Sequence, residues 1–294
     1  MESESLETQE IISPAIFYQQ DKTLIDIQIA TAKAYPRSIK RATDNAVEIV
    51  MMDKEFAEAC NYSLPRGNKP ISGPSVHLAK MLAQQWGNMR VDAKVVSIDA
   101  THVTSESACW DLETNLAIKA TVKRSIMQNV YEMKDGKSVK TGKMVRMNDD
   151  MITVTGNAAN SISMRNSILS VISRPVVNKV YSAAKQMITG DISDKNKLIA
   201  KRKRVVSGLK ETYGLTEKEI LQALGKAAID HIDADDILVL IGIGQSIKDG
   251  DTTVEQAFKK PMTREDRIKT AQERKEALKA SGKQNTSGPK IDMP

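Results

Sequence analysis

The sequence predicts an α+β protein: a helix, a three-stranded antiparallel meander plus a hairpin, and a long helix form a core, followed by a small all-helical domain. The residues from Met89 to Arg124 alternate between apolar and polar with period two, which is typical of half-buried strands. Helical periodicity flanks this stretch on both sides, and an acidic helical pattern over residues 211–258 indicates the trailing domain. With 294 residues and 40% hydrophobic content, the chain is long enough to bury a sizeable core.

Charge and composition divide the chain into five predicted parts. The net charge of +6 is unevenly spread, because residues 211–258 hold ten acids against three lysines, whereas residues 22–210 carry a net charge of +13. A basic block followed by an acidic one indicates a polyanion-binding core joined to a module with a different task. We therefore expect a flexible acidic arm (1–21), a core (22–190), a basic connector (191–210), an acidic helical domain (211–258) and a mostly disordered tail (259–294).

Helical patterns precede the strands. One helix is expected from Thr23 to Ala34, because the residue before Pro36 disfavours helical geometry, and a second from Ile39 to Ala59. After a loop over 61–72, Ser72, Gly73 and Pro74 open a further helix that stops at Gly87. Its polar face holds His77, Lys80 and Gln84.

The strand region resolves into three strands and a hairpin. The strands are expected over 89–98, 101–112 and 116–124, with a turn at Thr114 and Asn115. In the third strand, Lys119, Thr121 and Lys123 share one face, which predicts a basic side of the sheet. Asp135 and Gly136 mark the turn of a mobile, lysine-rich hairpin over 129–146.

The second half of the chain is helical. A long helix is expected over 149–172, Ser173 to Pro175 break it, and another helix runs to about Ile188. Residues 195–210 contain no acid, and form either a connecting helix or part of a binding surface. In the acidic domain, Asp233 is expected to cap a helix, and Thr216 with Glu219 and Thr252 with Glu255 have capping-box spacing.

Several classes of protein are disfavoured. Cys60 and Cys109 form no CxxC pair and have no histidine close by, so we expect two buried thiols in a reducing compartment. The longest apolar run, from Ile237 to Ile243, is too short for a bilayer, and the N-terminus is acidic where a signal peptide would be basic. The sequence therefore favours a soluble, cytoplasmic protein without a membrane partner.

No convincing catalytic constellation is apparent. The histidines are far apart in the sequence, and no glycine begins a phosphate-binding GxxxxGK[ST] motif. Asp99, Asp111 and Glu113 allow one enzymatic alternative, a metal-dependent nuclease. That reading is weakened by Asn115, which stands where the usual motif has a lysine. We expect no catalytic residue, metal site or cofactor.

Three motifs carry a resemblance to a known family. They are Pro70-Ile71-Ser72-Gly73-Pro74-Ser75-Val76-His77-Leu78-Ala79, Trp86-Gly87-Asn88, and Trp110-Asp111-Leu112-Glu113-Thr114-Asn115. Together with Ile247-Lys248-Asp249-Gly250-Asp251-Thr252-Thr253 near the end of the acidic domain, they make the chain similar to phage single-strand annealing proteins of the Redβ/RecT class over about residues 23 to 258. The resemblance implies ring or helical oligomers that pair complementary DNA strands without ATP, in a basic groove between the sheet and the long helix.

The resemblance also implies the residues and partners of the groove. Arg165 is the foremost candidate, because an arginine amid small polar residues on a packing helix is costly unless it meets an anion, either a phosphate or a buried carboxylate. The implied partners are single-stranded DNA and its annealed duplex, further copies of the chain, and a phage exonuclease or host single-strand-binding protein in the bacterial cytoplasm. A basic structural phage protein that binds nucleic acid non-specifically is the remaining alternative. The expected DNA contacts are Arg66, Lys69, Lys80, Lys119, Lys123, Arg124, Asn157, Arg165 and Arg174.

Overall fold

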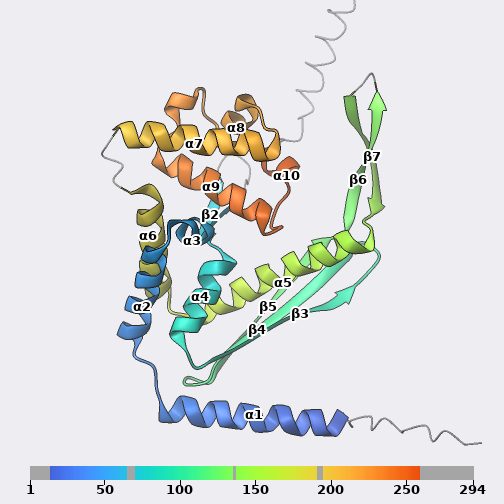
Figure 1. Ribbon diagram of the computed structural model, residues 1–294. Helices are drawn as coiled ribbons and strands as arrows, with labels where there is room; N and C mark the ends of the chain where they lie inside the picture. Colours follow the sequence, from blue (N-terminus) through green and yellow to red (C-terminus); the bar gives the residue numbers. More distant parts are fainter. Residues whose placement is uncertain (1–13, 65–69, 135–136, 191–194, 259–294) are drawn as a thin grey trace, which may run out of the picture.

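The computed structural model describes residues 14–64, 70–134, 137–190 and 195–258, and these form an α+β fold. A three-stranded antiparallel sheet and two separate two-stranded hairpins are combined with helices that lie mainly on one side of the sheet (Figure 1). The helices are α1 (Pro14–Ala34), α2 (Ile39–Met52), α3 (Lys54–Ala59), α4 (Val76–Trp86), α5 (Asp149–Val171), α6 (Arg174–Thr189), α7 (Lys195–Tyr213), α8 (Glu217–Leu224), α9 (Ala234–Lys248) and α10 (Val254–Phe258). The strands are β1 (Asn61–Leu64), β2 (Ile71–Pro74), β3 (Met89–Ile98), β4 (His102–Asp111), β5 (Leu116–Ser125), β6 (Met127–Lys134) and β7 (Lys137–Arg146).

The predicted meander is confirmed to within a residue or two at each strand end. Its order is β3-β4-β5, all antiparallel, and the turn between β4 and β5 places Asn115 at a φ of +58°, a left-handed conformation that asparagine tolerates. Alternate residues of β4 are buried because α5 lies along one face of the sheet (Figure 1). The predicted hairpin is also present as β6 and β7, although its turn at Asp135 and Gly136 lies outside the described residues.

Helix α5 packs directly on the sheet through small and polar side chains. A Cβ atom added to Gly156 would lie 3.2 Å from Val95, so the glycine permits a close approach of helix and strand. Nearby, the Ser105 hydroxyl donates to Asn160 at 2.6 Å, and the hydroxyls of Ser107 and Ser167 are 2.8 Å apart. These buried hydroxyls are therefore satisfied across the helix–sheet interface.

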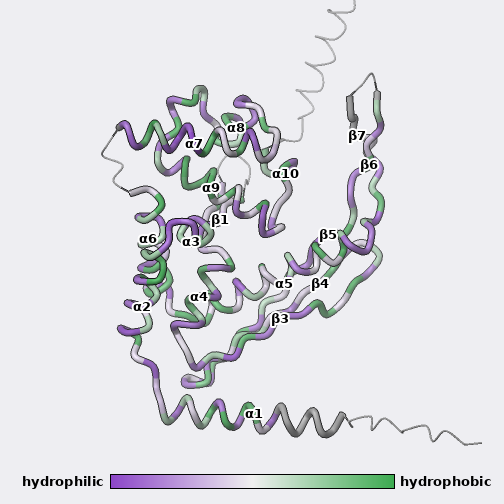
Figure 2. Tube along the Cα trace, viewed as in Figure 1, coloured by the Kyte–Doolittle hydropathy of each residue, from purple (hydrophilic) through white to green (hydrophobic). Residues whose placement is uncertain are grey.

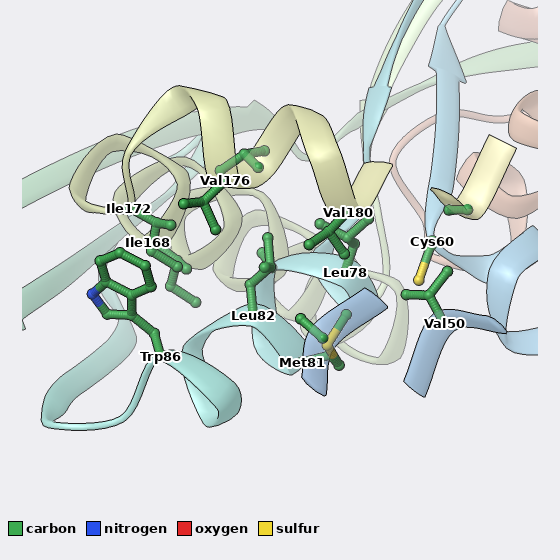
Figure 3. Close-up of a cluster of buried hydrophobic side chains, with 14 of the residues drawn as sticks. Val50, Cys60, Leu78, Met81, Leu82, Trp86, Ile168, Ile172, Val176 and Val180 are labelled. Carbon is green, nitrogen blue, oxygen red and sulfur yellow. The ribbon is translucent and has the colours of Figure 1, made fainter. Parts of the chain in front are cut away.

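The largest apolar cluster lies among α2, α4 and α6. Val50, Leu78, Leu82, Ile168 and Val180 are all buried at its centre (Figure 3). Burial of Cys60 and Cys109 in the same cluster raises the pKa of both thiols to about 12, as expected for thiols with a packing role.

Three helix boundaries in the N-terminal half differ from the predicted ones. The first helix begins at Pro14, inside the predicted flexible arm, and ends at Ala34 as expected. The predicted helix over 39–59 is interrupted at Asp53, whose extended backbone ends α2 and whose carboxylate caps α3. The predicted opening at Ser72 is wrong because Ser72 to Pro74 belong to β2, and Ser75 caps α4 instead. The predicted stop at Gly87 is confirmed.

The C-terminal helices form a second apolar cluster around α9. Ile237, Leu240 and Ile243 pack there with Phe258, and the hydrophobic stretch of α9 is visible in Figure 2. The predicted cap at Asp233 and the capping box of Thr216 with Glu219 are confirmed, whereas the second box joins Thr253 to Gln256, one residue later than predicted.

The two apolar clusters meet at α9. Leu238 belongs to the first cluster, and the side-chain amide of Asn61 in β1 donates to its carbonyl oxygen at 2.8 Å. A Cβ atom added to Gly242 would lie 2.9 Å from the backbone nitrogen of Ser63, so the helix and strand touch along their backbones. Within the described ranges, no helix has the length and apolar character needed to cross a membrane.

Candidate nucleic-acid interface

The face of the three-stranded sheet opposite α5, here called the outer sheet face, carries most of the exposed cations of the meander. Strand register fixes their arrangement: Lys94 pairs with Glu106, and Ala108 pairs with Lys119. The side chains on this face belong to Arg90, Asp92, Lys94, Thr104, Glu106, Ala108, Trp110, Ala117, Lys119, Thr121 and Lys123. The predicted basic side of the sheet is therefore present, and includes two cations, Arg90 and Lys94, that the sequence reasoning did not select.

The lysines of the outer sheet face are held only weakly. Lys119 is 69% exposed and lies 3.1 Å from Glu106, while Lys123 is 56% exposed and lies 3.4 Å from Asp99. Exposed ion pairs of this kind contribute about 0 to 1 kcal/mol, so a phosphate can replace the carboxylate at little cost. Hydrogen bonds from the backbone N–H groups of Thr101 and His102 hold the pKa of Asp99 far below its ordinary value, which keeps this carboxylate charged.

Trp110 gives the outer sheet face one aromatic surface. Its side chain is half-buried, and its indole N–H donates to the Asn115 side chain at 3.1 Å. Its cross-strand partners are Arg90 and Ala117, and α1 approaches this end of the sheet through a 3.2 Å contact between Arg90 and Gln28. In such an arrangement the cations can hold phosphates, and the aromatic ring can stack on one base at a time.

Two predicted contacts, Arg124 and Arg165, lie on the other side of the sheet and meet an aspartate rather than solvent. The Arg165 guanidinium is 3.0 Å from the carboxylate of Asp251, and their side chains are only 8% and 4% exposed. Arg165 also lies over the ring of Tyr62, with 4.2 Å between its Cζ and the ring centroid, and Arg124 donates to the backbone carbonyl of Asp251 at 3.0 Å. We call Arg124, Arg165, Tyr62 and Asp251 the inner arginine cluster.

Burial dominates the electrostatics of the inner arginine cluster. It raises the pKa of Asp251 above its ordinary value even though Arg165 acts in the opposite direction. Burial likewise lowers the pKa of Arg124, against the attraction of Asp251. Of the two anions that the sequence allowed for Arg165, a phosphate or a buried carboxylate, this conformation contains the carboxylate.

The remaining predicted contacts are dispersed. Lys80 on α4, Asn157 on α5 and Arg174 at the start of α6 are exposed, and Arg66 and Lys69 lie outside the described residues. Next to Lys80 on the same helix, the His77 ring lies 3.0 Å from Asp249, so the turn after α9 covers part of the polar face of α4. The predicted contacts thus fall into separate groups rather than one trough between the sheet and α5.

The carboxylates of the nuclease alternative are not brought together. Arg37 holds both Asp111 and Glu113, and lies over the ring of Trp86 with 4.9 Å between its Cζ and the ring centroid. Asp99 precedes β4, whereas Asp111 ends this ten-residue strand. In the parts of the chain that the structure describes, no group of three or more histidine, cysteine or acidic side chains could hold a metal ion.

Comparison with known proteins identifies no relative of the chain. No protein-family model matches the chain, and neither a curated protein nor a solved structure does.

Proposed function

We propose that this protein is an ATP-independent single-strand DNA annealing protein that holds the phosphates of a strand on its outer sheet face. The observation that carries the proposal is the placement of three exposed lysines on the two strands that flank β4, with Lys94 on β3 and Lys119 and Lys123 on β5. Lysines in this arrangement neutralise phosphates and release counterions, which supplies sequence-independent affinity.

The same surface suits strand pairing. Only 4% of the residues are aromatic, and Trp110 is the one aromatic side chain of the outer sheet face. A strand held mainly through its phosphates keeps its base edges free to meet a complementary strand. The proposed protein makes and breaks no covalent bond, and needs neither a metal nor a nucleotide cofactor.

Self-assembly along the strand is part of the proposal. In the described sheet, β3 and β5 are edge strands with unpaired backbone groups, and the edge strand β3 exposes Val96 and Ile98. Such edges are ready to pair with another chain, so a second copy is the partner that best suits them. Protomers lined up in this way would extend the outer sheet face along a DNA strand.

The proposal is tested by combining Lys94→Gln, Lys119→Gln and Lys123→Gln in the full chain. If each lysine holds one phosphate, the slope of log affinity against log salt should become less steep by about 2 for single-stranded DNA. Annealing of complementary oligonucleotides should slow in parallel. A matched variant with Lys179→Gln, Lys210→Gln and Lys218→Gln removes the same charge from helices α6, α7 and α8. It should keep the original slope.

Three outcomes would reject the proposal. An unchanged salt slope in the outer-face variant would place the phosphates elsewhere on the protein. Cleavage of labelled DNA in the presence of magnesium or manganese would support the nuclease alternative. Binding without faster duplex formation would indicate a structural phage protein that only packs against nucleic acid.

A further inference from the structure

A second cationic region lies far from the outer sheet face, in a cavity of about 760 Å³ between α3, the end of α6, α7 and α9. These four elements lie together on the side of the molecule away from the β6–β7 hairpin (Figure 1). The volume lies within the range of about 300 to 1,000 Å³ that is usual for small-molecule sites. The proposed function makes no use of this cavity.

The cavity is lined by both charged and aliphatic side chains. Five cationic side chains line it, from Lys54 on α3, from Lys197, Lys201 and Arg204 on α7, and from Lys248 on α9. Among the described residues that line the cavity, Glu55 and Glu58 are the two with carboxylates. The lining also contains aliphatic side chains, which include Ile188, Leu198 and Ile241. A ligand that fits this lining carries both a negatively charged group and an apolar or planar body.

Lys201, one of the residues that line this cavity, has an unsatisfied ammonium group. Among the buried side-chain nitrogen and oxygen atoms of the described residues, its Nζ is the one without a hydrogen-bond partner. Burial is the largest influence on Lys201 and, with Lys54 and Arg204 nearby, it lowers the pKa to about 8, although Glu58 opposes the change. A buried ammonium among other cations is costly to the fold, and an anion bound between them would remove that cost.

We propose that this cavity binds the phosphate group of a small phosphorylated molecule, with Lys54, Lys201 and Arg204 around the phosphate and the aliphatic side chains of the lining against the rest of the ligand. The excess of cations favours a phosphate over a single carboxylate, because a phosphate brings more charge and three acceptor oxygens. The site is independent of the outer sheet face, so either proposal can fail without the other.

The test measures binding of inorganic phosphate, pyrophosphate and adenosine monophosphate to the full chain by calorimetry and by thermal shift, at constant ionic strength. Lys201→Met should weaken binding of each probe by about tenfold or more, as expected for loss of a charged hydrogen bond. Lys203→Met is the matched control, since Lys203 is an exposed lysine of the same helix that does not line the cavity. It should bind the probes as the unsubstituted chain does.

Folding failure does not confuse this test, because Lys201→Met removes an unpartnered buried charge and should raise the melting temperature of the unliganded protein. Adenosine monophosphate binding more tightly than inorganic phosphate would support the role of the aliphatic side chains. Equal binding by Lys201→Met and the unsubstituted chain would overturn the proposal. Loss of the phosphate response when an oligonucleotide binds would also overturn it, because the cavity would then belong to a nucleic-acid path.

Discussion

Cations on the two faces of the central sheet have different surroundings, even where the residues are neighbours in sequence. Lys123 points to the outer face, is 56% exposed and has a loose partner in Asp99. Arg124, the next residue, points to the inner face, where it donates to the backbone of Asp251 beside the buried pair of Arg165 and Asp251. The charge of a segment therefore does not indicate its role, because strand alternation sends adjacent cations to solvent or to a buried carboxylate.

The largest effect that separates the two faces is expected from Arg165→Met. This change leaves Asp251 as a buried carboxylate without its ion-pair partner, and should lower the free energy of unfolding by about 3 to 5 kcal/mol. Urea denaturation measures the loss.

The double variant Arg165→Met with Asp251→Leu is the control for this prediction, because it removes both charges. It should recover most of the lost stability, since a buried ion pair can often be exchanged for apolar side chains. If the single and double variants are equally destabilised, loss of the ion pair between Arg165 and Asp251 does not explain the lower free energy of unfolding.

The next largest effect is expected in the fluorescence of the two tryptophans on binding of DNA. Trp86 is only 7% exposed, whereas Trp110 is half-buried on the outer sheet face. In a Trp86→Phe background, single-stranded DNA should quench the fluorescence that remains, because a base can stack on Trp110. Trp110→Ala should weaken binding by about 1 to 3 kcal/mol. In a Trp110→Phe background, the emission of Trp86 should not respond to DNA; a response there would place the contact outside the outer sheet face.

The smallest expected effect is in the pH dependence of folding, where Asp99 and Asp251 should act in opposite directions. The pKa of Asp99 is lowered in the folded protein by backbone hydrogen bonds, so its contribution to stability is present above the ordinary value and is lost as the pH falls. Burial raises the pKa of Asp251, so its contribution is greatest at low pH and is lost as the pH rises through the raised pKa.

Unfolding free energies measured across the acid range check these signs. Relative to the unsubstituted chain, Asp99→Asn should flatten the loss of stability on acidification, and Asp251→Asn should steepen it. Changes of the same sign in both variants would contradict the difference between the two faces.

The local structure follows closely from the sequence, because its signals are local. The alternation from Met89 to Arg124 predicts all three strands of the meander, and the cap at Asp233 predicts the start of α9. The β1–β2 hairpin was missed because each strand has only four residues, and prolines and glycines around them are equally typical of a loop.

Long-range pairing explains what could not be predicted. Arg165 and Asp251 are 86 residues apart, and no periodicity connects them, so the sequence could name an anion for Arg165 without choosing between phosphate and carboxylate. Arg90 and Lys94 were available, since both occupy alternate positions of a predicted strand, but only the register with β4 places Arg90 opposite Trp110 and Lys94 opposite Glu106, on the same face as Lys119.

Lysine footprinting tests the central proposal most directly. The full chain is acetylated briefly with and without a saturating oligothymidylate, and the modified lysines are quantified by mass spectrometry. Lys94, Lys119 and Lys123 should be protected by the oligonucleotide, while Lys179, Lys210 and Lys218 should react equally in both samples. Equal labelling of the three outer-face lysines with and without DNA would show that the strand does not lie on this face of the sheet.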